Sequence, residues 1–326
     1  GNVYFDVKKF KNYGKLSGQS LSQKITAARD EVVEDKDKKN PADFALWFKR
    51  VGKFKNHSMH WLSPWGDGFP GWHIECSAIT STYLGQPFDI HAGGVDHIGT
   101  HHTNEIAQSE SAYGKPLAKY WLHGEFLLLD HSKMAKSKGN FITIEDITKK
   151  GFHPLAFRYL VLNSHYRSKL NFSWRALEAA EKTLHYIYAD WQHLPEKLRT
   201  SQVLTIKKGV AAIQKLETSF AKAINYDLNT PKALAVFHKT LKSRHIAEDD
   251  KKRLLLCFDT VLGLGLQGIT SSKIPGSITA LAQKREAFRG NKQFVKADEL
   301  RKQIEKLGYV VEDTNSGPSI KRKLIS

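Results

Sequence analysis

The period of hydrophobic and polar positions changes near residue 154, and this change divides the chain into two parts. Before it, short apolar runs bounded by turn residues predict strands at 3–7, 88–96, 120–123 and 126–129. We expect the run at 88–96 to be a buried strand that ends in a glycine turn. Because a helical pattern separates this strand from the next two, the order predicts half of a parallel α/β sheet.

Helix signals also occur in the first part. Residues 21–28 have a short helical pattern, and a helix is predicted to begin at Trp72. Residues 42–50 are predicted to be helical because Asn40 is a good N-cap and Pro41 suits the first helical position. A further helix is predicted over 101–113, where Gly114 is a typical stop signal.

After Pro154 the apolar positions follow a helical period. The predicted helices span 174–191, 205–224, 231–244 and 249–262. Short connections between such helices favour an antiparallel bundle. Residues 263–275 then read as a linker, residues 278–306 as a charged helical pair around Gly290 and Asn291, and residues 308–313 as a strand.

Composition narrows the function classes. The 326 residues suggest more than one domain, and no apolar run is long enough for a spanning helix. Fifty Lys and Arg against 33 Asp and Glu give a net charge of +17, which favours a polyanionic partner such as nucleic acid. A generally basic proteome is the alternative. With two cysteines, Cys76 and Cys257, and no visible signal peptide, we expect a reducing cytoplasm and no disulfide framework.

A candidate zinc site comes from three residue types. His101 and Glu105 are four apart on a predicted helix and share one face, and Cys76 lies near the start of another segment. Zinc accepts thiolate, imidazole and carboxylate in one tetrahedral site. His102 is an alternative ligand, although it points about 100° away from His101. A buried cysteine beside a surface His–Glu pair is the alternative reading of this spacing.

Two further segments have the chemistry of a nucleotide site. Lys133 and Lys136 lie in a lysine-rich turn that could neutralise the charge of a reacting phosphate, although a solvated turn has the same pattern. At the end of the predicted strand 88–96, Gly94 lets a ligand approach the backbone and Asp96 could accept hydrogen bonds from a ribose. Trp72 could form the wall of a small pocket or belong to the core.

Together these segments resemble the cysteinyl-tRNA synthetases, a family of class I aminoacyl-tRNA synthetases. The resemblance rests on residues 70–77, 88–96, 101–110 and 133–137, with support from 1–7, 40–47, 165–172 and 296–301. It covers nearly the whole chain. It implies an α/β plus all-α fold: a partial Rossmann-like catalytic domain, a helical bundle and a small C-terminal α/β element.

The resemblance assigns roles to individual residues. Cys76, His101 and Glu105 match three of four zinc ligands in the family, and Lys136 matches the ATP-contacting lysine of its Lys-Met-Ser-Lys-Ser loop, where this chain has Ala135 for serine. The other assignments are Lys133 beside the phosphates, Gly94 and Asp96 at the adenosine, and Trp72 near the substrate.

The chain departs from the family in its first part. The fourth ligand, a cysteine, and the His-x-Gly-His motif both belong to an N-terminal catalytic half that we do not find, so we expect an N-terminally truncated chain. Residues 97–101 imitate the motif but fall at the entrance of the zinc helix. Cys257, in the predicted bundle, is a poor substitute ligand.

The implied domains follow from the family. They are 1–62, a connective region between catalytic halves; 63–130, the second catalytic half with the zinc ligands; 131–173, the nucleotide loop and stem-contact region; 174–264, a tRNA-binding helical bundle; and 275–326, a small C-terminal domain.

The implied function is ATP-dependent activation of cysteine to cysteinyl-adenylate and its transfer to tRNA(Cys). Zinc would select the thiol, and Mg²⁺ would accompany ATP. Expected partners are tRNA(Cys), cysteine, ATP and the missing N-terminal half, with no membrane. A mycothiol-type ligase that joins cysteine to an amino sugar, and a non-catalytic fragment that binds tRNA or zinc, are the alternatives.

Overall fold

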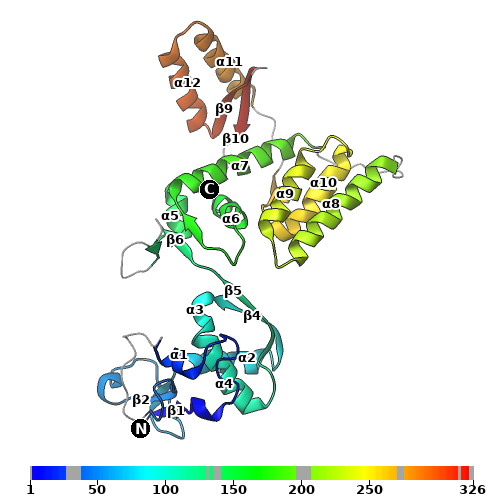
Figure 1. Ribbon diagram of the computed structural model, residues 1–326. Coiled ribbons are helices and arrows are strands. Elements are labelled where there is room, and N and C mark those ends of the chain that lie inside the picture. Colours follow the sequence, from blue (N-terminus) through cyan, green and yellow to red (C-terminus); the bar gives the residue numbers. More distant parts are fainter. Residues whose placement is uncertain are drawn as a thin grey trace. The chain divides into compact units, whose positions relative to one another are not determined.

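The structure is a computed structural model that describes residues 2–26, 38–129, 132–134, 141–195, 207–269, 275–314 and 317–322 (Figure 1). The chain divides into two compact units, residues 1–126 and residues 127–326. Helices and small sheets occur in both, so the mixed α/β class expected from the sequence is confirmed. Among the helices within these ranges, none has both the length and the apolar character needed to cross a membrane.

The first unit begins with a three-stranded antiparallel sheet. Strand β2 (Phe44–Lys49) lies between β1 (Val3–Phe5) and β3 (Gly68–Pro70). Short helices α1 (Leu21–Thr26), η1 (Val7–Lys9) and η2 (Gly52–Phe54) connect these elements. The strand predicted over 3–7 is confirmed over 3–5 only, because Asp6 caps η1, which begins at Val7. The helix predicted over 21–28 is confirmed over its described residues, 21–26.

The helix predicted over 42–50 is wrong, because these residues form β2. The expected capping residues close a turn instead: the Ala42 amide donates to Asn40 Oδ1, and Asp43 accepts from the amides of Asn40 and Val7. The next residues are aromatic or aliphatic and pair with strands on both sides, which offsets the local helix signal. Tertiary pairing therefore decides the structure of this segment.

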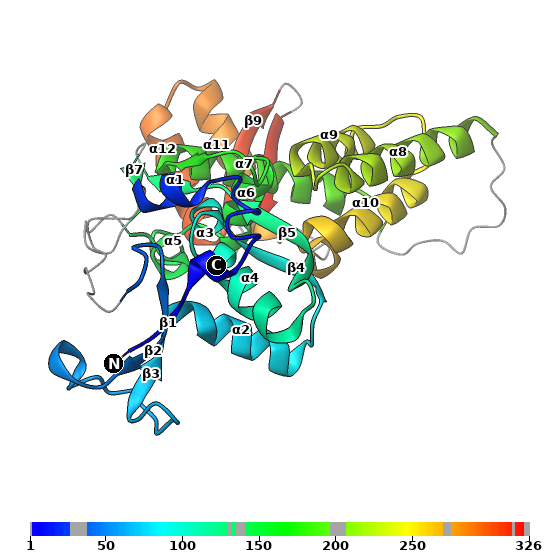
Figure 2. The ribbon, with the colours of Figure 1, turned by 60° about the horizontal axis from the view of Figure 1, so that its bottom comes forward.

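The expected parallel strands are β4 (Phe88–Gly94) and β5 (Ala118–Gly124). Between them lie α3 (Val95–Ile98) and α4 (His101–Tyr113), and α2 (Trp72–Tyr83) packs against α4 (Figure 2). Gly114 ends α4 at a φ of 65°, as predicted. The expectation of a buried strand is only half correct, since Phe88 is 6% exposed but Ile90 is 60% exposed. One face of this small sheet is uncovered within the unit.

The second unit starts with strands and short helices, of which the sequence predicted the strand at 126–129, confirmed as β6 (Leu127–Leu129), and the helical stripe after Pro154. Strand β6 pairs with β7 (Ser132–Lys133) and, in parallel, with β8 (Leu170–Phe172). The unpredicted helix α5 (Ile144–Lys149) begins with a capping box between Thr143 and Asp146. The helical stripe seen after Pro154 is α6 (Pro154–Leu162).

The predicted helices of the bundle are confirmed. They are α7 (Trp174–Gln192), α8 (Lys207–Asn225), α9 (Thr230–Leu241) and α10 (Glu248–Leu262). They share one apolar core, in which Phe220 stacks on Phe258 at a centroid distance of 4.0 Å. The predicted linker is wrong over 263–269, because Leu264 and Leu266 are fully buried in that core around η4 (Leu266–Gly268). Residues 270–274 of it lie outside the described residues.

The C-terminal segment is a helical pair packed on a hairpin. Helices α11 (Gly276–Gly290) and α12 (Phe294–Lys306) confirm the predicted pair, and β9 (Tyr309–Thr314) confirms the predicted strand. Strand β10 (Gly317–Arg322), antiparallel to β9, was not foreseen. The finer domain boundaries proposed from the sequence stay a prediction.

Candidate metal centre

Helix α2 can start only where a glycine precedes it. A Cβ on Gly71 would clash with the carbonyl of Ala45 in β2, and the Gly71 amide donates to the Leu46 carbonyl at 3.0 Å. The neighbouring Pro70 pairs with Trp47, which fixes the approach of the chain. This anchoring sets the direction of α2 and thereby the place of Cys76, one turn into the helix.

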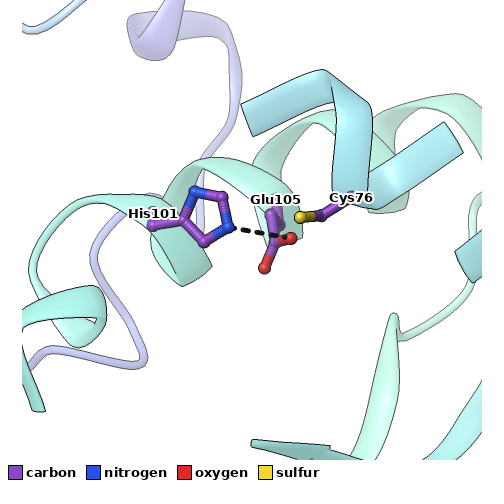
Figure 3. Close-up of side chains that lie close together, drawn as sticks. All are labelled: Cys76, His101 and Glu105. Carbon is purple, nitrogen blue, oxygen red and sulfur yellow. Dashed lines mark ion pairs between the residues drawn. The ribbon is translucent and has the colours of Figure 1, made fainter. Parts of the chain in front are cut away.

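Helix α4 supplies the other two predicted ligands from one face. His101 is 4% exposed and Glu105 is 1% exposed, with His101 Nε2 3.3 Å from Glu105 Oε1 (Figure 3). Gln108, one turn further on, donates from Nε2 to the carbonyl of His73 and to Ser77 Oγ, at 2.5 Å and 2.6 Å. The buried amide thus holds α2 and α4 together beside the site.

The three predicted zinc ligands converge. One ligand atom each from Cys76, His101 and Glu105 lies within 4.8 Å of the other two, and the Cys76 sulfur points toward the carboxylate (Figure 3). A second group with the same property is His91, His102 and Glu105. His91 Nε2 lies 2.8 Å from Glu105 Oε2, so the two oxygens of one buried carboxylate serve two groups.

Electrostatics suit a cation at this place. Burial alone would raise the pKa of Glu105, but hydrogen bonds from His101 and His91 outweigh it and lower that pKa to about 2. Burial, followed by His101, lowers the pKa of His73 to about 4, and burial with His91 lowers the pKa of His102 to about 3. At neutral pH the cluster therefore holds a carboxylate and at least two uncharged imidazoles.

The thiol of the cluster is protonated without a metal. Burial, then the neighbouring charge of Glu105, raises the pKa of Cys76. A thiolate forms here when a cation compensates the second negative charge. A soft sulfur, an imidazole and a carboxylate are the donor set that zinc accepts, so these residues fit the ion.

Trp72 lies at the site and outside the core. Its ring stacks on His101 at a centroid distance of 4.5 Å and an interplanar angle of 26°, while the residue is 58% exposed. Of the two roles considered for Trp72, the core role is therefore wrong. An exposed indole beside a candidate ligand has the position of a pocket wall.

The carboxyl end of β4 is crowded by histidines. A Cβ on Gly93 would lie 2.6 Å from His102 Cε1 and 2.8 Å from His97 Nδ1, and one on Gly94 would clash with the Asp96 carboxylate. Glycine is required at both places because these rings and this carboxylate approach the backbone. Gly94 is the N-cap of α3, and Asp96 lies in its first turn.

The lysine loop is only partly described. The backbone of Lys133 pairs with Leu128 at the end of β7, in the second unit. Lys136 lies outside the described residues. The two lysines therefore stay predictions as ATP contacts.

The other cysteine, Cys257, is exposed on α10.

Sequence reasoning gave no role to three buried or half-buried histidines of the cluster. His73 Nδ1 is 2.9 Å from His101 Nδ1, His91 contacts Glu105, and His123 Nε2 is 2.8 Å from His102 Nδ1. A partial signal existed for His123, because the sequence predicted a parallel sheet with a strand over 120–123, at whose carboxyl end His123 lies. The register that pairs His123 with Gly93 is known only from the structure. The carboxyl ends of parallel strands are where ligands bind in α/β sheets.

Comparison with known proteins shows the family of the chain. The family model described as "tRNA synthetases class I (C) catalytic domain" matches residues 1–182, and that described as "Cysteinyl-tRNA ligase anticodon binding domain" matches residues 271–317. The fold and the site thus define a class I aminoacyl-tRNA synthetase. Curated relatives named "Cysteine--tRNA ligase" come from Treponema denticola (40% identity, 99% of this chain, 70% of the relative) and Chlamydia abortus (41%, 98% and 69%). The chain belongs to the cysteine–tRNA ligase family.

Two further matches are a curated relative and a solved structure. The cysteine–tRNA ligase of Thermus thermophilus is 39% identical over 98% of this chain and 68% of its own. A solved LeuRS–tRNA–LeuAMS complex from Agrobacterium radiobacter matches with 14% identity and a TM-score of 0.49, over 67% of this chain and 34% of that chain.

Proposed function

We propose that this chain acts as a cysteine–tRNA ligase polypeptide, which activates cysteine with ATP and transfers it to tRNA(Cys). The single observation that supports this most is the convergence of Cys76, His101 and Glu105 in a member of that family. A thiol-binding centre is what such an enzyme needs in order to distinguish cysteine from serine, because a lost strong contact discriminates better than a lost methylene.

Cys76, His101 and Glu105 would hold the zinc ion together with the fourth ligand expected from the N-terminal half, and the ion would recognise the substrate through its sulfur. When bound, zinc supplies a soft Lewis acid that prefers a thiolate to a serine hydroxyl. The chain's own contribution is to keep these donors in place: His91 fixes Glu105 from its second oxygen, and Gln108 fixes α2 against α4. The indole of Trp72 would exclude water from one side of the bound amino acid.

Around this centre the chain would orient ATP. Gly94 lets the nucleotide approach the backbone, Asp96 would accept hydrogen bonds from the ribose, and Lys133 and Lys136 would neutralise the phosphates, to which Mg²⁺ also binds. In the first step the cysteine carboxylate attacks the α-phosphate, and cysteinyl-adenylate forms as pyrophosphate leaves. In the second step the terminal ribose hydroxyl of tRNA attacks the adenylate carbonyl, and AMP leaves.

A second α/β segment is the proposed partner for the uncovered side of the β4–β5 sheet. Ile90 and Tyr120 pair across the two strands and are both exposed. Parallel sheets are normally covered on both faces. The N-terminal half predicted from the sequence, with a fourth zinc ligand and an ATP motif, is the proposed occupant. A cytoplasmic location stays a prediction.

Cysteine-dependent exchange of pyrophosphate into ATP, zinc content and tRNA charging test this function. We expect the purified chain to bind tRNA(Cys) and to hold zinc weakly, and to catalyse exchange only with the proposed N-terminal half added. Robust exchange by the chain alone would contradict the proposed division of the site. Absence of both zinc and tRNA(Cys) binding would contradict the function.

A ligase that joins cysteine to an amino sugar shares the same first step. The match of residues 271–317 to an anticodon-binding domain favours tRNA as the acceptor. Transfer of cysteine to an amino sugar, with no charging of tRNA(Cys) by the same preparation, would reverse this preference. A fragment that binds tRNA or zinc without catalysis would give no cysteine-dependent pyrophosphate exchange, even with the proposed N-terminal half added.

A further inference from the structure

The segment between β2 and β3 combines positive charge with exposed aromatic rings. Residues 44–66 contain no Asp or Glu, and their four cations are Lys49, Arg50, Lys53 and Lys55. The nearest acid that follows, Asp67, is already paired, because His60 Nδ1 lies 2.7 Å and Arg50 NH1 3.4 Å from its carboxylate. The segment therefore presents positive charge without a competing anion from its own residues.

The tryptophans of this segment share one face of the sheet. Lys49 and Trp61 both pair with Gly68, from opposite sides, so their side chains leave the sheet on the same side. Because Gly68 has no side chain, the indole of Trp47 occupies the gap, and its Nε1 would lie 2.5 Å from a Cβ at Gly68.

A tight turn adds the last ring to this face. The amides of Ser63 and Gly66 each donate to the carbonyl of the other, and Trp65 within the turn lies 6.2 Å from Trp47, centroid to centroid. The stem of Lys49 runs along the same turn, since its Cε would be 3.8 Å from a Cβ on Gly66. We call Trp47, Lys49, Trp61 and Trp65 the tryptophan face.

The other side of the sheet holds the aromatic rings that stabilise the segment. Phe48, Phe54 and Phe69 contact one another at centroid distances of 4.9–5.3 Å, and His57 stacks on Phe69 at 3.7 Å. The fold of the segment thus has its own small core. Trp61 and Trp65 are not part of it and are 51% and 53% exposed.

We propose that the tryptophan face binds a single-stranded end of RNA, with unpaired bases stacked on Trp61 and Trp65 and the backbone held by Lys49 and its neighbouring cations. This inference rests on the proposed function, because it names the part of the tRNA that the first unit contacts. Stacking platforms flanked by cations are typical of proteins that bind single strands without reading the sequence. The unpaired charges of the segment are all positive, which complements the phosphates of a single strand, while the exposed indole rings offer flat surfaces for its bases.

Binding of labelled RNA hairpins to the full chain, measured by fluorescence anisotropy, tests the proposal. One hairpin ends in a short unpaired 3′ strand and the other is blunt. We expect tighter binding of the first hairpin. Trp61→Ala or Trp65→Ala should weaken its binding on the order of tenfold, because each removes one stacking surface. Trp61→Phe keeps a ring for stacking and should restore most of the affinity. The affinity for the blunt hairpin should be the same in all three variants as in the parent chain.

Tyr83→Ala is the control, because Tyr83 is an aromatic residue of the same unit, on α2, and at 81% it is more exposed than either tryptophan. Thermal unfolding of each variant checks that the small core is intact. Equal binding of both hairpins by a chain that still binds tRNA(Cys) would overturn this inference and leave the proposed function unchanged. A parent chain that does not bind tRNA(Cys) would instead count against the proposed function. A dimer that Trp61→Ala dissociates, detected by light scattering, would assign the face to a second copy and also overturn the inference.

Discussion

The two cysteines occupy different environments, and this difference gives a controlled test of the metal site. Cys76 lies within 4.8 Å of a buried imidazole and a buried carboxylate, whereas Cys257 is exposed on α10. Cys76→Ser replaces a thiolate with a hydroxyl, which is a much weaker zinc ligand. We expect the zinc affinity to fall by more than the ~10–100-fold that the loss of an outer-shell partner costs.

Cobalt substitution provides the measurement. A thiolate-to-cobalt absorption band should be present in the parent chain and in Cys257→Ser and absent from Cys76→Ser, with zinc content by elemental analysis as a second reading. The same comparison applies to the chain with its proposed N-terminal half added. Stoichiometric zinc in Cys76→Ser would remove Cys76 from the ligand set.

A buried guanidinium makes the C-terminal segment sensitive to acid. Arg285 is 1% exposed and donates from both terminal nitrogens to Asp313, at 2.6 Å and 3.2 Å. These hydrogen bonds hold the pKa of Asp313 below its ordinary 3.8. Because the folded pKa is lowered, the pair contributes stability above pH 3.8, and this contribution is lost as the pH falls through the folded value.

Hydrogen exchange of residues 275–322, followed from neutral pH down to about pH 3, checks this expectation. Asp313→Asn should speed exchange at neutral pH, because the buried guanidinium loses its charged partner, and should flatten the dependence on pH. Glu299→Gln, at an exposed position on the adjacent helix α12, is the matched control. A parent segment whose exchange protection is unchanged down to pH 3 would contradict the prediction.

The residues that sequence reasoning found and those it missed differ in how local their signal is. His101 and Glu105 are one helical turn apart, so a single predicted helix places both on one face. His91 and His123 come from β4 and β5, and only the register of those strands brings them to the same edge. That register depends on tertiary pairing, which the spacing of residues along the chain does not contain.

Among the elements, two glycines allow the same substitution to be tested with opposite expected signs. Gly114 ends α4 at a φ of 65°, with no heavy atom within 4 Å of a would-be Cβ, so Gly114→Ala adds backbone strain and no clash. Gly209 lies within α8 and also has open space around it. Gly114→Ala should destabilise the chain by about 1 kcal/mol, and Gly209→Ala should stabilise it by up to about 1 kcal/mol.

Denaturant unfolding followed by circular dichroism measures both effects. Gly114→Asn, which tolerates the left-handed region better than alanine, should lie between the parent and Gly114→Ala. Equal effects of alanine at the two glycines would mean that the φ of Gly114 does not determine how α4 ends. Because α4 carries His101 and Glu105, zinc affinity should follow the stability of Gly114 variants but not of Gly209→Ala.

Elements with a strong period were predicted well and those set by pairing were not. The helices α7, α9 and α10 follow from an apolar stripe that local sequence contains. Strand β2 reads locally as a helix, because Asn40 suits an N-cap as well as it suits the turn that it forms with Asp43. Its sheet partners are distant along the chain, because β1 ends at Phe5 and β3 begins only at Gly68. No local pattern reports their pairing.

At the scale of the whole molecule, the charge of +17 predicts how binding to tRNA responds to salt. Each phosphate that a Lys or Arg neutralises releases condensed counterions, so log affinity falls linearly with log salt concentration. If the chain makes about 6–10 such contacts, affinity for tRNA(Cys) should fall by roughly 10³–10⁵ between 50 mM and 200 mM salt. An unrelated tRNA should show a similar slope, because phosphate contacts carry no sequence information. The difference between the two tRNAs should then persist at high salt, where base contacts dominate. Filter binding over this range measures both slopes, and an affinity that salt leaves unchanged would show that the excess of basic residues does not face the RNA.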